Sequence, residues 1–437
     1  MRLLNRKAQF VFLFILLPLL TTRCGSEPEV AKPAAMPAAA VRWVTWDANN
    51  QLEALLVKQF QETHPQIEFK REEMNAPLDT YISKPPRPDM VNLEAGYELD
   101  NAIRKNQVAD LTDIWIQAGL LDAIPASIQK ASVHDGKQYY LPTGFGWEAI
   151  YYNKQIFAKY NLQPPKTWEE FLKLCDTLLS HGETPLAISG SEYTGNYWFE
   201  YLDLRLNGPE FHRGLLAGKE HFTDARVRRV LETWKGLFDA GYFVEGRGAL
   251  GDLSTLTALV RNDEGQLHQP KAVMALSDTY AAGQLLDKFQ AELGFFRFPV
   301  IEPNVAVAEV IDPSGYAVPV GAEHIPEALA FLTHLSAVGT QNLIVQNELF
   351  QAVKFAPARS DLAADHLNAE QKQALEMVKS ANDTVVPFFN AVPREMLGMV
   401  EYVYRRFINE PKDIDGFLQK FEEARQKMVE QGKLGQE

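Results

Sequence analysis

Apolar positions near the start of the chain alternate between the spacing of strands and the spacing of a helix. Val41–Trp46 is β-branched and aromatic, which predicts a strand. Apolar residues recur at helical spacing over Leu52–Phe60, and this helix is expected to end at His64, because a residue before proline disfavours the helical conformation. Alternation over Ile67–Lys70 and a short apolar run at Pro88–Leu93 predict two further strands. Strand, helix and strand in this order predict a βαβ unit in a parallel sheet.

The middle of the chain has the spacing of amphipathic helices. Thr167–Glu170 is a capping box, and the apolar stripe over Trp168–Leu179 predicts the helix that follows it. A second stripe over Val227–Phe238 predicts a helix that begins at Thr223, and a third stripe covers Ala328–Leu335. The aromatic residues within these stripes are expected to be core residues.

Two segments are predicted to be strands that leave one sheet and enter another. These are Ala149–Asn153 and Gly294–Val300, and a mostly helical insert separates them. A chain that crosses out and returns in this way would form two lobes, each discontinuous in sequence.

The N-terminus has the features of an export signal. Basic residues precede the apolar stretch Phe10–Leu20, which is too short to span a bilayer core of about 30 Å as a helix. Cys24 follows almost at once, and the segment resembles a lipoprotein signal, in which this cysteine would be lipidated. Cleavage near Ala38–Ala40 and an uncleaved anchor stay open as alternatives, and all three place the rest of the chain outside the cytoplasm. Residues 25–40 are rich in proline and alanine and predict a semi-stiff tether.

The composition narrows the function classes. The 437 residues carry 43 Lys and Arg against 57 Asp and Glu, a formal net charge of −14. An acidic body of this kind repels phosphate backbones, which argues against nucleic acid as a partner. Hydrophobic residues make up 46% of the chain, which suffices for a large core and argues against disorder. Cys175 is the only cysteine besides Cys24, so we expect no disulfide framework and a small, buried, unreactive Cys175.

Several short segments occur in an order that carries more information than any one of them. The segments are Val41–Trp46, Phe60–Pro65, Pro88–Val91, Leu111–Asp113, Asp135–Pro142, Ile150–Lys154, Pro164–Phe171, Trp234–Phe243, Lys271–Met274, Phe298–Pro299, Gly315–Pro319 and Glu327–Leu332. The Pro-Pro-Lys-Thr-Trp stretch that begins at Pro164 is the most specific of them. As an ordered set, from about Val41 to Met428, they resemble the family 1 extracellular solute-binding proteins, the sugar-capturing components of bacterial ABC importers.

The resemblance implies an α/β, two-lobed, periplasmic-binding-protein-like fold with hinge-linked discontinuous lobes and a ligand cleft between them. After a signal peptide (1–24) and the tether (25–40), lobe 1 would combine 41–149 with 297–353, and lobe 2 would combine 150–296 with 354–437. The implied function is capture of a sugar or oligosaccharide and its delivery to ABC transporter membrane subunits. The protein would be a periplasmic or cell-surface monomer that meets the membrane only through an anchor on Cys24.

Candidate ligand contacts follow from the chemistry of sugars. Sugar C–H faces stack on aromatic rings, and sugar hydroxyls need both donors and acceptors. Aromatic residues in loops beside acids or amides are therefore candidate ligand contacts, together with positions that the resemblance carries over. The candidates are Trp46, Asp47, Glu94, Tyr97, Trp147, Glu148, Tyr193, Trp198, Asp278, Tyr280, Gly315, Tyr316 and Arg359. Gly144 and Gly146 are expected to let a ligand approach closely.

Other functions stay open. Carboxylates at Glu148, Glu192 and Glu200 could form a glycosidase pair, although the chain has no hydrolase, phosphate-loop or dithiol motif. Two tyrosine pairs, Tyr139–Tyr140 and Tyr151–Tyr152, could bind ferric iron, and a polyamine would suit the acidic balance. Our main expectation is a binding protein that is no enzyme and needs no cofactor and no metal.

Overall fold

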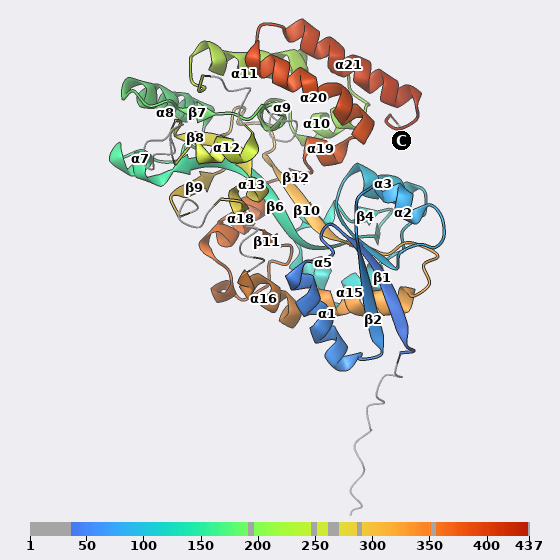
Figure 1. Cartoon of the computed structure of the whole chain (residues 1–437). Helices are drawn as coiled ribbons and strands as arrows, with labels where there is room; N and C mark the ends of the chain where they lie inside the picture. The colour runs from blue at the N-terminus through green and yellow to red at the C-terminus, as the bar shows by residue number, and fades with distance from the viewer. Residues whose placement is uncertain are drawn as a thin grey trace, which may run out of the picture. The chain divides into compact units, whose positions relative to one another are not determined.

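The structure is a computed structural model that describes residues 36–190, 196–245, 251–260, 271–285, 291–348, 350 and 355–435 (Figure 1). Most strands of the described residues belong to one connected sheet. Its order is β2 (Ile67–Glu73), β1 (Ala39–Thr45), β3 (Met90–Glu94), β10 (Ala308–Ala317), β6 (Leu141–Asn153), β8 (Met274–Asp278) and β7 (Leu186–Ala187). The predicted α/β class is therefore confirmed.

The predicted βαβ unit is present at the start of the ordered chain. Strand β1 pairs in parallel with both β2 and β3, and helix α1 (Gln51–Thr63) connects β1 to β2. Asn50 caps α1 by accepting a hydrogen bond from the backbone N–H of Glu53. The buried face of α1 packs against helix α15 (Ile325–Ser336), where the rings of Phe60 and Phe331 lie 5.3 Å apart. This packing fixes the end of β1, and Trp46, the first candidate ligand contact along the chain, directly follows that end.

Two long strands, β6 and β10, connect two groups of elements (Figure 1). The first group surrounds strands β1, β2 and β3, and the second group surrounds strands β7, β8 and β9 (Leu293–Phe296). The first part of β6, through Trp147, pairs with β10, and from Glu148 onward β6 pairs with β8 and with β9. The prediction that residues 149–153 belong to a crossing strand is confirmed. The prediction for Gly294–Val300 is wrong, because β9 pairs only with β6 and the returning strand is β10.

Helices cover the part of the sheet formed by β7, β8 and β9. Helix α8 (Trp168–Ser180) begins with the predicted capping box of Thr167 and Glu170. Cys175 on its inner face is a free, buried thiol, and burial raises the pKa of that thiol, as expected for an unreactive core residue. The N-cap of helix α11 (Ala225–Asp239) lies one residue later than predicted, because Asp224 rather than Thr223 caps the helix.

The C-terminal helices complete this second group. Helices α20 (Arg394–Asn409) and α21 (Ile414–Glu430) pack on α9 (Tyr197–Leu206), with the ring of Phe199 5.9 Å from that of Phe417. The remaining described elements are α2 (Leu78–Ile82), α3 (Tyr97–Arg104), α4 (Thr112–Gln117), α5 (Leu120–Ala123), α6 (Ala126–Gln129), β4 (Val133–His134), β5 (Lys137–Gln138), α7 (Lys154–Lys159), α10 (Pro209–Leu216), α12 (Asp252–Thr257), α13 (Thr279–Gly283), α16 (Val338–Gln346), β11 (Ala356–Pro357), η2 (Ala364–His366), α18 (Ala369–Lys379), β12 (Asp383–Val385) and α19 (Phe388–Ala391).

In the described part of the chain, no single helix has the length and hydrophobicity to cross a membrane. Helices α15 and α16 reach that length and hydrophobicity only when taken as a pair, and the chain bends by 66° between them. The predicted signal peptide, Cys24 and most of the tether lie outside the described residues.

Asp383 on β12 links the two groups of elements. Its carboxylate accepts hydrogen bonds from Lys130, which follows α6, at 2.7 Å, and from Arg213 on α10. It also accepts from the backbone N–H of Thr384 at 2.9 Å. Burial alone would raise the pKa of Asp383, but the hydrogen bonds from Lys130 and Arg213 outweigh it and hold that pKa below its ordinary value.

We expect Asp383→Ala to lower the free energy of unfolding at neutral pH by about 1–3 kcal/mol, because a buried network loses its central acceptor while both cations stay solvated. Because the folded-state pKa is depressed, this contribution is present at neutral pH and is lost as the pH falls through that pKa. Denaturant unfolding at pH 7 and in acid measures it. Asp415→Ala, which removes an exposed partner of Arg228, is the control and should have no measurable effect. Equal stability of the Asp383→Ala variant and the parent at pH 7 would contradict the assignment.

Candidate functional site

A cavity of about 680 Å³ lies beside the crossing strands, and both groups of elements contribute to its walls. Trp46 follows β1, Glu94 ends β3 and Asp278 ends β8. These positions fit the rule that ligands of open α/β sheets lie beyond the carboxyl ends of strands. Further lining residues include Gly146, Trp147, Glu148, Tyr197, Thr279, Tyr280, Gln284, Asp312, Phe355, Phe389, Asn390 and Arg394.

Aromatic rings form much of the cavity wall. Trp46 is 39% exposed, although its indole N–H hydrogen bonds to Glu94. Trp147 is buried on β6 and packs on Phe295, with ring centroids 5.3 Å apart. The indole N–H of Trp147 has no hydrogen-bond partner among the described residues, so it is available to a guest molecule. Tyr280 is 68% exposed at the start of α13. Flat apolar faces of this kind suit the C–H faces of a sugar.

Carboxyl groups form the polar part of the wall. Burial raises the pKa of Glu94 to about 7 against the opposing effect of a backbone hydrogen bond, and the negative charge of Glu98 adds to the rise. Burial, followed by the charges of Glu200, Asp278 and Asp312, raises the pKa of Glu148 well above its ordinary value. Burial and the charge of Glu94 likewise raise the pKa of Asp312, although a hydrogen bond from Asn390 opposes the change. The cavity therefore favours protons or other positive charge.

The carboxyl groups differ in how far the protein itself satisfies them. Asp278 accepts hydrogen bonds from the Tyr197 hydroxyl at 2.8 Å and from the backbone N–H of Ala281 at 2.6 Å. Asp312 accepts one from the Asn390 side-chain amide at 2.8 Å. Glu148 is only 3% exposed, and neither of its carboxyl oxygens has a partner in the described structure. A buried acceptor without a donor is costly, so Glu148 indicates where a ligand donor would bind.

The structure brings six of the predicted residues together and places the other described ones elsewhere. The six that line the cavity are Trp46, Glu94, Trp147, Glu148, Asp278 and Tyr280. Asp47 is exposed outside the lining and accepts a hydrogen bond from the backbone N–H of Asn49. Tyr97 lines a different cavity, and Tyr193 lies outside the described residues.

For four of the other predictions the structure gives a correction. Trp198 is fully buried between Phe171, Phe243 and Phe298, so it is a core residue. Tyr316 is buried against Trp43, with ring centroids 5.6 Å apart. Arg359 is buried and bonds to Asp361 and to the backbone carbonyls of Ala118 and Ser336. Gly315 serves strand packing, because an added Cβ would lie 2.1 Å from the carbonyl oxygen of Leu141.

The glycines before Trp147 also have a structural role in addition to any ligand contact. An added Cβ at Gly144 would lie 3.0 Å from the carbonyl oxygen of Ala356. At Gly146, which lines the cavity, an added Cβ would lie 2.7 Å from the Thr279 hydroxyl. The close approach that was predicted for a ligand is therefore made by the protein's own chain.

Several lining residues were missed by the sequence reasoning. Trp198 was predicted as a ligand contact, but its neighbour Tyr197 lines the cavity instead. Phe389 and Asn390 form an aromatic–amide pair, the same signal that identified other candidates, and could have been found by it. Asp312 carries a weaker signal, an acid within an otherwise apolar strand segment.

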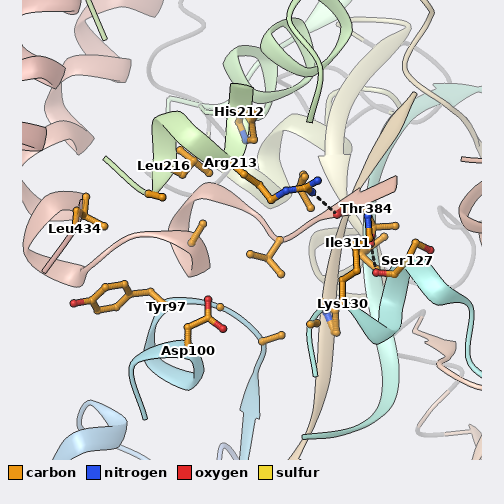
Figure 2. Close-up of a pocket in the computed structure, with 18 of the residues that line it drawn as sticks. Tyr97, Asp100, Ser127, Lys130, His212, Arg213, Leu216, Ile311, Thr384 and Leu434 are labelled. Atoms are coloured by element: carbon orange, nitrogen blue, oxygen red, sulfur yellow. Dashed lines mark hydrogen bonds between the residues drawn. The ribbon is translucent and has the colours of Figure 1, made fainter. Parts of the chain in front are cut away.

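A second cavity of about 540 Å³ lies beside α3 and α10 (Figure 2). Its charged side chains are largely satisfied within the protein. Lys130 and Arg213 both bond to Asp383, Arg213 also donates to the Thr384 carbonyl at 3.3 Å, and Lys433 bonds to Glu395. Tyr97 lines this cavity. Because the charged side chains of this second cavity largely have partners, we regard the cavity beside the crossing strands as the candidate site.

The geometry weighs against the alternative chemistries. No group of three or more His, Cys, Asp or Glu residues in the described ranges could hold a metal ion. The Tyr140 hydroxyl is committed to the backbone carbonyls of Leu93 and Pro313, at 2.7 and 2.9 Å, and neither tyrosine pair lines the candidate site. Glu200 accepts hydrogen bonds from Asn196 and from the backbone of Phe388 and does not line the site. Glu192 lies outside the described residues.

Comparisons with known proteins agree with this architecture. An uncharacterised ABC transporter extracellular-binding protein of Pyrococcus horikoshii is 24% identical over 378 residues, which cover 80% of this chain and 79% of the relative. A probable sugar-binding periplasmic protein of Mesorhizobium japonicum is 25% identical over 296 residues, 66% of each chain. Among solved structures, the solute receptor AcbH, described as preferring β-D-galactopyranose, is similar with a TM-score of 0.79 and 19% identity, over 90% of this chain and 99% of that one.

A chitin oligosaccharide binding protein is similar with a TM-score of 0.70 and 20% identity, over 90% of this chain and 99% of the other. At these identities the solved structures establish the fold, which is the predicted two-lobed one. The sequence profile of the bacterial extracellular solute-binding proteins matches residues 45–342, more than half of the chain. The chain belongs to the family of bacterial extracellular solute-binding proteins.

Proposed function

We propose that this protein captures a sugar or short oligosaccharide outside the cytoplasm and delivers it, chemically unchanged, to the membrane subunits of an ABC transporter. The observation that carries the proposal is the shared cavity, in which Trp46 and Trp147 lie together with the acceptors Glu94, Glu148 and Asp278. Stacking faces and hydrogen-bonding groups in one site are what sugar recognition requires. Relatives named as sugar-binding periplasmic proteins support the substrate class.

We propose that the ligand is released unaltered. Hydrolysis of a glycoside needs two carboxyl groups on opposite sides of the scissile bond, one held as an acid and one ionised. Glu200, one of the carboxylates considered for such a pair, is bonded within the core. The family consists of binding proteins, which supports capture without chemistry.

Delivery requires a state that the transporter can distinguish. We propose that lobe 1 (41–149 with 297–353) and lobe 2 (150–296 with 354–437) close over the sugar by a hinge at the crossing strands. Closure is a population shift that the ligand drives only through contacts it makes better in the closed form. A monomer held at the cell surface through a lipidated Cys24 would present that closed form to the membrane subunits.

A cationic solute such as a polyamine is the second candidate. The observation that favours it is the excess of carboxyl groups in the site, five against the single guanidinium of Arg394. A ferric-iron receptor is less well supported, because neither tyrosine pair lines the cavity.

Thermal-shift screening of the mature chain against monosaccharides, oligosaccharides, polyamines and ferric iron tests the proposal. A ligand that binds only the native state stabilises it by about 2.7 kcal/mol at a hundredfold excess over Kd. We expect at least one sugar to raise the melting temperature by several degrees and to be recovered intact by chromatography. No shift with any sugar, together with a shift from spermidine or ferric iron, would replace the sugar by that solute.

A further inference from the structure

The charge balance of the candidate site is one-sided. Its described lining contains five carboxyl groups, and its only cationic side chain is the guanidinium of Arg394. That guanidinium lies 3.0 Å from the carboxylate of Glu98, and the Arg394 side chain is 55% exposed. Arg394 and Glu98 therefore form an exposed pair, and the other four carboxyl groups of the described lining are those of Glu94, Glu148, Asp278 and Asp312.

The protein's neutral donors reach three of these four groups. Trp46 donates to Glu94, Tyr197 donates to Asp278, and Asn390 donates to Asp312. Both carboxyl oxygens of Glu148 lack a hydrogen-bond donor among the described residues, although only 3% of the residue is exposed. The backbone carbonyl of Glu148 already accepts a hydrogen bond from the Tyr201 hydroxyl. Of the acceptors on Glu148, the side-chain carboxyl is therefore the one left to bind a guest molecule.

We propose that the guest carries a protonated amino group that binds Glu148, so that the site prefers an amino sugar to a neutral or an acidic sugar. This inference rests on the proposed function, because it names the substrate class of the same site. An ammonium group has three donors and no acceptor, which suits the two carboxyl oxygens of Glu148 that lack a donor among the described residues. Hydrogen bonds between an ammonium and a carboxylate are also stronger than those between a hydroxyl and a carboxylate.

A neutral sugar would satisfy the cluster less well. Its hydroxyls could donate to Glu148, but the carboxyl groups would still repel one another when ionised. A uronic acid would add a sixth carboxylate to the site and be disfavoured. The aromatic walls do not oppose a cation, because an ammonium group is attracted to the faces of Trp and Tyr rings. Trp46, Trp147 and Tyr197 supply such rings.

The protonation of the empty site gives independent support. Burial raises the pKa of Glu94 to about 7 and raises the pKa values of Glu148 and Asp312 above their ordinary values, so the empty cavity holds protons more strongly than free carboxyl groups do. The titratable or charged groups that surround the Glu148 side chain are Glu200, Asp278, Asp312 and Tyr197. A bound ammonium would favour the ionised carboxyl groups and so displace protons from the site.

Matched sugar pairs test the inference. Isothermal titration at pH 7 would compare glucose with glucosamine, galactose with galactosamine and mannose with mannosamine, and would include glucuronate and galacturonate. We expect the amine of at least one pair to bind tenfold or more tightly than its hydroxyl counterpart, with release of protons to the buffer. For that amine, affinity should fall about fivefold or more from pH 7 to pH 5.5, because protons compete for Glu94 and Glu148.

Glu148→Gln separates the specific contact from a general effect of charge. The variant keeps the size of the side chain and removes a buried charge, so we expect it to fold. Affinity for the amino sugar should fall tenfold or more, and by a factor at least threefold larger than the loss for the matched neutral sugar, because only the amino sugar loses an ion pair. Glu376→Gln removes an exposed charge on α18, outside the cavity, and should change neither affinity.

The outcomes distinguish this inference from the proposed function. If neutral sugars bind as well as or better than their amines, or if Glu148→Gln weakens both equally, the inference is wrong while sugar capture stands. If no sugar of the panel binds, the inference is wrong, and sugar capture is overturned as well only if the thermal-shift screen also finds no sugar or oligosaccharide. Binding of spermidine without any sugar would retain the cationic site and replace the sugar.

Discussion

Replacing Gly315 by alanine is expected to lower the free energy of unfolding by about 3 kcal/mol or more, because the added methyl group overpacks the contact between the two crossing strands. The new Cβ would lie 2.1 Å from the carbonyl oxygen of Leu141 and 2.7 Å from the Cα of Pro142. Both atoms belong to the backbone of β6, which cannot move as a side chain can. The strain falls where β10 and β6 shift register, between Ser314 and Gly315.

Thermal and denaturant unfolding of the mature chain would measure this loss. Gly236→Ala is the matched control, since Gly236 lies on the exposed face of α11 and an added Cβ there meets nothing within 4 Å. We expect that change to stabilise the protein by up to about 1 kcal/mol through helix propensity. An equal, small effect of both substitutions would show that the crossing strands have more room than their geometry implies.

Local signals explain which elements could be predicted. The capping box at Thr167 and Glu170 and the strand at Val41–Trp46 depend on residues close in sequence, and both elements form. The returning strand β10 was missed because it contains Pro313 and Gly315, which locally argue against a central strand. The register shift beside Gly315 accommodates them, and that shift depends on distant residues of β6.

Residues that line the cavity could be predicted where they end or follow strands. Trp46, Glu94 and Asp278 were found because each ends or follows an apolar strand segment. Tyr197 was exchanged for its neighbour Trp198, because every residue of α9 is buried, including Glu200, Asp203 and Arg205, so polarity does not mark the side of the helix that meets the cavity. Asn390 lies 78 residues from its partner Asp312, so their contact depends on the tertiary fold.

A large effect on ligand binding, independent of whether the sugar carries an amine, is expected from Trp46→Ala. One ring that covers 50–100 Å² of a sugar face contributes about 1–2.5 kcal/mol at ~25 cal/mol/Å², which corresponds to about 5- to 60-fold in affinity. Loss of the Trp46 ring also removes the hydrogen bond to Glu94. Because Trp46 is 39% exposed, the variant should keep its stability to within about 1 kcal/mol. Tyr402→Ala, which removes a 68% exposed ring on α20 outside the cavity, is the control.

Isothermal titration of the parent, Trp46→Ala and Tyr402→Ala with the sugar that gives the greatest thermal shift tests the location of the binding site most directly. We predict that Trp46→Ala binds at least fivefold more weakly, that Tyr402→Ala binds like the parent, and that the sugar is recovered intact from all three. Unchanged affinity of Trp46→Ala, or conversion of the sugar during the titration, would contradict a protein that holds its solute between these rings and releases it unaltered.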